Sequence, residues 1–203
     1  MPVKLYIGFL CGLLAMCLPT LAAMAQTGPG GVGNDNGTGQ PENVLWLRAD
    51  TAVNQTPGGT AATNNSDPVQ EWLDISGNAN NFVQTTSGSV PALGTGSSGI
   101  NGQPVIIFDG TGDFLEDSDG GANYINGLNE FTVFFITRSD ATSSDRGFFD
   151  TEGPDGNDDI LGIRYDSDGA NSTRTDIIKV GITDSDNTDV AQLETSATIN
   201  GVS

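Results

Sequence analysis

The sequence predicts an all-β fold, built as a sandwich or a barrel of short strands. The chain has 203 residues with 28 glycines, and it is rich in Asn, Asp, Ser and Thr, which favour turns. Short β-branched and aromatic runs recur between these turn-rich clusters. No stretch after the signal-like start keeps a helical period for more than two turns. The length corresponds to about one domain.

The start of the chain, residues 1–25, has the features of a secretory signal peptide. Lys4 supplies a positive charge, Leu5–Leu18 forms an apolar core, and Ala23-Met24-Ala25 is a small-x-small cleavage site. The apolar stretch is too short for a membrane span and is broken by Pro19. We therefore expect export, a mature chain that starts at Gln26, and no membrane insertion after signal removal.

The mature chain lacks several reactive side chains. Cys11 and Cys17 lie in the signal, and the sequence has no histidine. Disulfides, cysteine nucleophiles, histidine-ligated zinc and Ser-His-Asp triads are excluded. Without Lys4, 6 basic residues face 26 acidic ones, a net charge of −20. Such a charge disfavours nucleic acid, and it leaves cations, glycans and protein surfaces as partners.

Residues 26–42 are rich in Gly, Asn and Gln, and we expect a flexible lead-in to one domain at residues 43–203. The first half of this domain has four short strand patterns, at Asn43–Ala49, Val69–Asp74, Phe82–Val83 and Val105–Phe108. The last one ends at Asp109-Gly110, which is typical of a strand that leaves a sheet through a tight turn. Asp109 and Asp113 are expected to bind backbone N–H groups of that turn.

Phe131–Thr137 is the strongest strand pattern in the chain. Its apolar residues fall on both faces, which predicts a central strand buried on both sides. Later strand patterns are Phe148–Phe149, Ile160–Tyr165, Ile177–Ile182 and a strand pair within Val190–Val202. The Ile160 and Ile177 runs are expected to form a hairpin. One core is expected to bury Ile106, Phe108, Val133 and Phe135.

Three stretches carry a family resemblance. They are Leu45–Asp50 (LWLRAD), Trp72–Asn80 (WLDISGNAN) and Asn101–Leu115, which ends in FDGTGDFL. In this order and spacing they resemble the concanavalin A-like lectin/glucanase superfamily, and within it the laminin-G-like domains of secreted surface proteins of Bacteroidetes-type bacteria. The resemblance implies an antiparallel two-sheet jelly-roll sandwich. Such domains continue past the equivalent of Ser203, so we expect this one to be incomplete at its C-terminus.

The acidic loops are candidate calcium sites. Calcium prefers six to eight oxygen ligands, and laminin-G-like relatives often bind it. The favoured candidates crowd one turn between two strands: Asp150, Glu152, Asp155, Asp158 and Asp159. No cluster fits the EF-hand loop. The alternative interpretation is that these aspartates cap their own turns.

Catalysis is not expected. Related glucanases carry an E-x-D-x-x-E strand, and none of the six glutamates lies in that pattern. Trp46 and Trp72 could stack on a sugar ring, but their strand patterns favour core positions.

The sequence therefore predicts a secreted, non-catalytic module for glycan binding or adhesion at a bacterial cell surface, as part of a larger protein. The alternative is a structural spacer or protein-interaction domain without a small ligand. A glycan-active enzyme is the least favoured hypothesis.

Overall fold

The computed structural model confirms the all-β class. It describes residues 43–117, 124, 130–138, 146–151, 160–166, 177–183 and 189–194. All strand pairs within these ranges are antiparallel, and their one helical element is the short 3-10 turn η2, Gly96–Ser98. The described part of the chain contains no helix that is long and apolar enough to cross a membrane.

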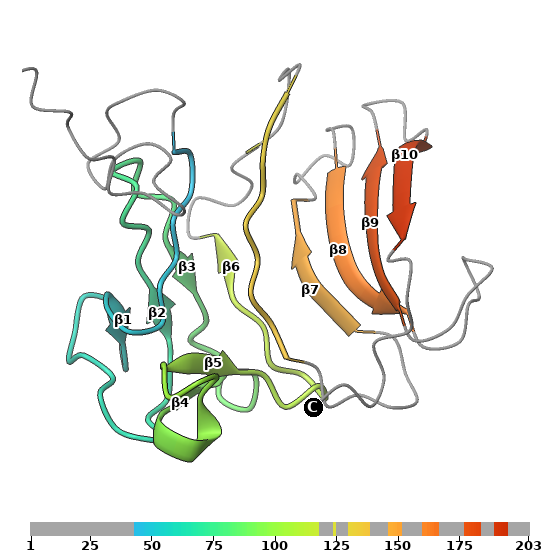
Figure 1. Ribbon diagram of the computed structural model, residues 1–203. Coiled ribbons are helices and arrows are strands. Elements are labelled where there is room, and N and C mark those ends of the chain that lie inside the picture. Colours follow the sequence, from blue (N-terminus) through green and yellow to red (C-terminus); the bar gives the residue numbers. More distant parts are fainter. Residues whose placement is uncertain are drawn as a thin grey trace, which may run out of the picture.

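The first sheet has the order β1-β2-β3-β6 and is made of two-residue strands. These are β1 Val53–Asn54, β2 Glu71–Trp72, β3 Phe82–Val83 and β6 Glu116–Asp117. Beside them, β4 Ala92–Gly94 and β5 Val105–Ile107 form a hairpin (Figure 1). The first core buries four residues, Val53, Ala62, Val69 and Leu93. Trp72, Ile106 and Leu115 pack against this cluster.

The second sheet has longer strands in the order β10-β9-β8-β7. The strands are β7 Arg146–Asp150, β8 Ile160–Asp166, β9 Ile177–Thr183 and β10 Asp189–Glu194. Pairing of β8 with β9, with Ile163 opposite Val180, confirms the predicted hairpin. Alternate residues of β8 point into the second core, and Leu161, Ile163 and Tyr165 are buried. Of the predicted Val190–Val202 pair, only Val190–Glu194 lies within the described residues, where it belongs to β10.

Aromatic rings join the two sheets. The ring of Phe82 in β3 lies 6.4 Å from that of Phe149 in β7, between centroids. Tyr124 lies 6.4 Å from Phe82 and 6.2 Å from Phe149. Three rings at these distances attract one another and anchor the sheets across the gap between them.

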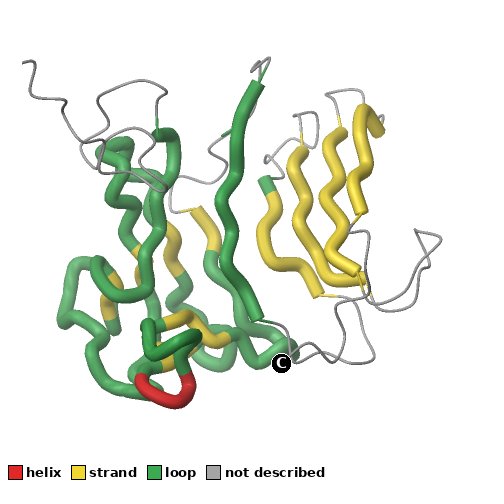
Figure 2. The backbone as a smooth tube through the Cα atoms, viewed as in Figure 1, coloured by secondary structure: helices red, strands yellow, loops and turns green. Residues whose placement is uncertain are grey.

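The predicted central strand at Phe131–Thr137 is wrong as a buried element. The segment is not assigned to any strand, and it runs between the two sheets as an extended loop (Figure 2). All its residues are exposed, and Ile136 is 86% exposed. The physical reason is the lack of a partner, since no described strand pairs with it. Its side chains face the sheet of β8, β9 and β10 across an open space and do not pack closely against that sheet.

The predicted single core of four residues is also wrong. Ile106 is half-buried and packs against the first cluster. Phe108, Val133 and Phe135 are 45%, 45% and 44% exposed. Phe108 follows β5 directly into the Asp109 turn, and among the described strands β5 pairs only with β4. The described residues form two smaller cores, one for each sheet.

The predicted first strand, Asn43–Ala49, is not assigned as a strand either. A buried carboxylate, Asp74, holds this segment in place. Its Oδ1 accepts hydrogen bonds from the backbone N–H of Trp46 and Ser76, both at 2.9 Å. Its Oδ2 accepts from the Ser76 hydroxyl at 2.7 Å and from the Asn80 N–H at 3.2 Å. Hydrogen bonds to one side chain thus hold this segment, in place of the backbone hydrogen bonds of a strand pair.

Candidate interaction site

The structure describes one of the five predicted calcium ligands. Asp150 lies exposed at the end of β7. Glu152, Asp155, Asp158 and Asp159 lie outside the described residues. Among the residues that are described, no three acidic side chains gather closely enough to hold a metal ion. The calcium site therefore stays a prediction.

The Asp109 turn is built as the sequence predicts. The carboxylate of Asp109 accepts hydrogen bonds from the backbone N–H and the hydroxyl of Thr111, at 2.7 and 2.6 Å. Asp113 accepts a hydrogen bond from the Asp109 N–H at 2.9 Å. Gly110 has a φ of 73°, which glycine adopts without strain. Both carboxylates serve the turn itself.

Hydrogen bonds to the carboxylates of Asp109 and Asp67 make the stability of their turns depend on pH. The hydroxyl and the N–H of Thr111 hold the pKa of Asp109 below its ordinary range. The backbone N–H groups of Asn64 and Thr63 do the same for the pKa of Asp67. A lowered pKa in the folded state means stability that is present above the unfolded pKa and is lost as the pH falls through the folded one.

We predict that Asp109→Asn lowers the free energy of unfolding slightly near neutral pH and that this deficit closes on acidification. Urea unfolding at about pH 6 and at about pH 3 measures the gap between wild type and variant. Wild type and variant both lose negative charge on acidification. Comparing them at the same pH therefore cancels the effect of this general charge loss on stability. A gap that widens toward low pH would contradict this account.

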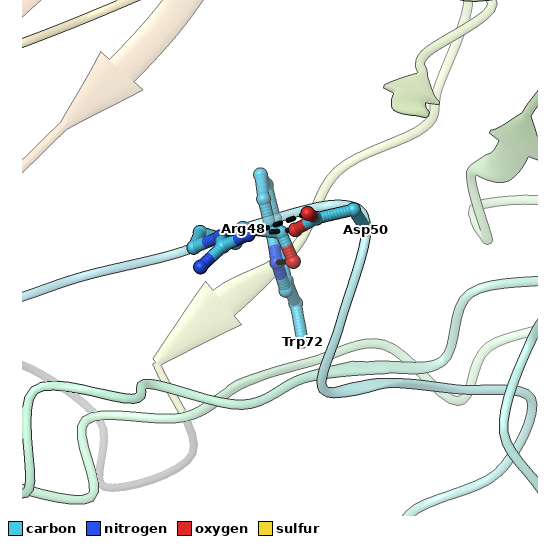
Figure 3. A network of polar contacts seen from close by, with 3 residues as sticks. All are labelled: Arg48, Asp50 and Trp72. Atoms are coloured by element: carbon cyan, nitrogen blue, oxygen red, sulfur yellow. Dashed lines mark hydrogen bonds and ion pairs between the residues drawn. The ribbon is translucent and has the colours of Figure 1, made fainter. Parts of the chain in front are cut away.

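A polar and aromatic cluster lies on the surface next to the first sheet. Arg48 donates hydrogen bonds to the carboxylate of Asp50 from Nε at 3.0 Å and from Nη2 at 2.5 Å (Figure 3). This contact lowers the pKa of Asp50. The guanidinium also stacks over the ring of Trp46, 5.6 Å from its centroid. The indole N–H of Trp72 donates to the Arg48 carbonyl at 2.9 Å.

Both tryptophans thus contribute to the structure at the edge of the core. Each is half-buried, which agrees in part with the predicted core positions. The ring of Trp46 is covered by Arg48, and Trp72 packs against the first cluster. A sugar could reach the Arg48–Asp50 pair, whose side chains are 44% and 36% exposed.

A second candidate site is an apolar groove of about 850 Å³ along Phe131–Thr137, which we call the exposed segment. One wall of the groove is the exposed segment, and the other is the face of β8, β9 and β10. The sheet side is lined by Leu161, Ile163, Ile178, Val180, Ile182 and Leu193. Figure 1 shows the exposed segment as the extended trace between β6 and β7.

Side chains of the exposed segment alternate between the groove and the outside over Phe131–Phe135, whereas the neighbouring Ile136 and Thr137 both line the groove. Phe131, Val133 and Phe135 line the groove, and Phe135 touches Phe148 of β7 with 5.7 Å between ring centroids. Phe134 is 59% exposed and does not line the groove. Over Phe131–Phe135 this period of two is that of a β-strand. The segment therefore has strand geometry without a strand partner among the described residues.

The groove is lined mainly by apolar side chains. Its polar lining residues are Glu130 and Thr137, and the others are aliphatic or aromatic. A sugar buried there would leave most of its hydroxyl groups without hydrogen-bond partners, which costs free energy. Burying an apolar peptide surface there would not carry this cost, because such a surface has few polar groups to leave unpaired. The sequence indicated the apolar run correctly but not that it lies open, because burial depends on what packs against it.

Comparisons with known proteins leave the family open. No family model matches the chain, and a search of curated proteins finds no significant match. Among solved structures, the chain is similar to residues 221–444 of an S-layer domain-containing protein from Clostridium thermocellum, with 22% sequence identity and a TM-score of 0.45. The match covers 78% of this chain and 60% of the other.

Proposed function

We propose that the chain is a secreted, non-catalytic adhesion module of a bacterial cell surface, and that it binds protein through the apolar groove and the exposed segment. The observation that carries this proposal is the open apolar strand. Ile136 is 86% exposed and Phe134 59% exposed in one extended run. Contiguous exposed apolar surface on a soluble protein typically marks an interaction site.

The other parts of the proposal rest on the sequence and the fold. The signal-like residues 1–25 support export. Two antiparallel four-stranded sheets support, as the finer fold, the laminin-G-like jelly roll that the motifs resemble. Such a fold can host many functions, so the proposed function is inferred from the groove and not from the fold.

Adhesion assays with paired phenylalanine variants test this function. Beads coated with the exported chain should stay on envelopes of the bacterium that secretes it. Phe134→Asp should reduce retention at least tenfold, because it places a charge in an apolar contact. Phe114→Asp is the matched control, since Phe114 is 45% exposed and lies outside both the groove and the exposed segment. Equal retention for both variants would contradict the proposal.

Glycan binding is the second candidate, favoured by one observation. The Arg48–Asp50 pair presents planar polar groups on the surface next to the half-buried ring of Trp46. Such groups can bind sugar hydroxyls. A glycan array should then give signals that Arg48→Ala removes and Phe134→Asp leaves unchanged. Signals that Arg48→Ala leaves intact would exclude this cluster.

Calcium support is a further part of the proposal and rests on the acidic sequence from Asp150 to Asp159. We predict that a calcium excess raises the melting temperature of the exported chain by about 5–10 °C, because a ligand at a hundredfold excess over its Kd adds about 2.7 kcal/mol. Sodium chloride at matched ionic strength should not reproduce the shift, since screening is not specific. An equal shift with both salts would leave the aspartates as turn residues.

A further inference from the structure

We infer that the partner of the exposed segment is a second copy of this chain, and that the two segments pair antiparallel about Phe134. This inference rests on the proposed function and names the partner of that site. It follows from three properties of Phe131–Thr137: its open backbone, its side-chain order and the charges at its two ends.

The backbone of the exposed segment pairs with no strand in the described part of the chain. Within the described part of the chain, none of its backbone N–H or carbonyl groups forms a backbone hydrogen bond. An extended apolar segment in this state is a template for adding a strand, which would supply those bonds. The occupant that fits best is therefore another extended segment.

The order of side chains makes the exposed segment complementary to itself. Antiparallel pairing about Phe134 puts Val133 opposite Phe135 and Phe131 opposite Thr137 on the groove face. On the other face Phe134 meets its own copy. Aromatic and β-branched residues directly opposite one another stabilise antiparallel pairs. The Phe135 of the second copy would lie next to the groove and cover part of its apolar lining.

The two flanking charges select the antiparallel direction. Glu130 and Arg138 border the exposed segment, and both are exposed. Antiparallel pairing about Phe134 places Glu130 of each copy opposite Arg138 of the other, so two ion pairs close the ends. Parallel pairing in register would set Glu130 against Glu130 and Arg138 against Arg138. Opposite charges across a contact favour one register and disfavour the others.

The net charge of the chain should make this association depend on salt. Two mature copies of charge −20 repel each other at long range. Added salt screens that repulsion within about 10 Å at 0.1 M, whereas the apolar contact is unaffected or strengthened. Self-association should thus be weak in about 20 mM salt and stronger in about 500 mM salt.

Charge reversal tests the proposed register. Sedimentation equilibrium of the exported chain should show a dimer whose affinity rises with salt. Glu130→Arg puts two like pairs into the dimer, and so does Arg138→Glu, so each variant should associate at least about tenfold more weakly. The two variants mixed together should recover the dimer, because one copy then carries arginine, and the other glutamate, at both ends of the segment. The double variant should recover it as well.

The outcomes separate this inference from the proposed function. A monomer at every salt concentration would overturn self-pairing, and so would assembly that the charge variants leave unchanged. If Phe134→Asp nevertheless abolishes bead adhesion in that case, the exposed segment binds a different protein and the proposed function stands. If Phe134→Asp also leaves adhesion intact, both proposals fail. Circular dichroism of each single variant checks that it remains folded, and recovery in the mixture shows this independently.

Discussion

Replacement of Asp74 by alanine is expected to lower the free energy of unfolding by about 3–5 kcal/mol. The Asp74 carboxylate is 8% exposed and accepts four hydrogen bonds. Without it, the N–H groups of Trp46, Ser76 and Asn80 lose their acceptor at a site that water reaches poorly. Loss of one partner of a buried polar group costs more than the bond itself contributes.

Urea unfolding of Asp74→Ala measures this loss, and Asp109→Ala is the matched control. Both aspartates accept hydrogen bonds in turns, but Asp109 is exposed, so water can replace its carboxylate. The loss should be several times larger at Asp74. Equal losses at the two sites would show that Asp74 does not hold the Asn43–Asp50 segment to the first sheet.

Leu161→Ala is expected to have the second large effect, a loss of about 2–5 kcal/mol. Leu161 is 2% exposed in β8 and belongs to the core of the second sheet. Truncation removes buried methyl groups and leaves a cavity that β-sheet neighbours fill only in part. Leu193→Ala in β10 is the control, because Leu193 is 64% exposed. Similar losses for both leucines would contradict the two-core arrangement.

Local patterns predicted much of the fold. The turn-rich Ser/Asp/Gly/Asn stretch between Ile160–Tyr165 and Ile177–Ile182 predicted a hairpin, and β8 and β9 form it. Asp109-Gly110 predicted a turn with its own carboxylate bonds, which the structure confirms. In these cases the physical cause lies within a few neighbouring residues, so the sequence shows it directly.

Long-range features were not predictable in this way. Asp74 binds the backbone of Trp46 across 28 positions, and its motif of Trp, Asp, Ser and Asn showed a turn but not this role. The apolar residues of Phe131–Thr137 predicted burial, and their exposure depends on which strands pair nearby. The calcium candidates around Asp150 came from charge density, which gives no geometry.

Hydrogen exchange at the backbone amides of Phe131–Thr137 tests the central claim most directly. The claim is that this segment has strand geometry and is available to pair with a strand of another molecule. In dilute protein at low salt, its amides should exchange nearly as fast as in an unfolded chain, while those of β8 and β9 are protected. At high salt and high protein concentration, the same amides should become protected. Protection equal to that of β8 and β9 in the dilute monomer would contradict the account, because the segment would then be paired within its own chain.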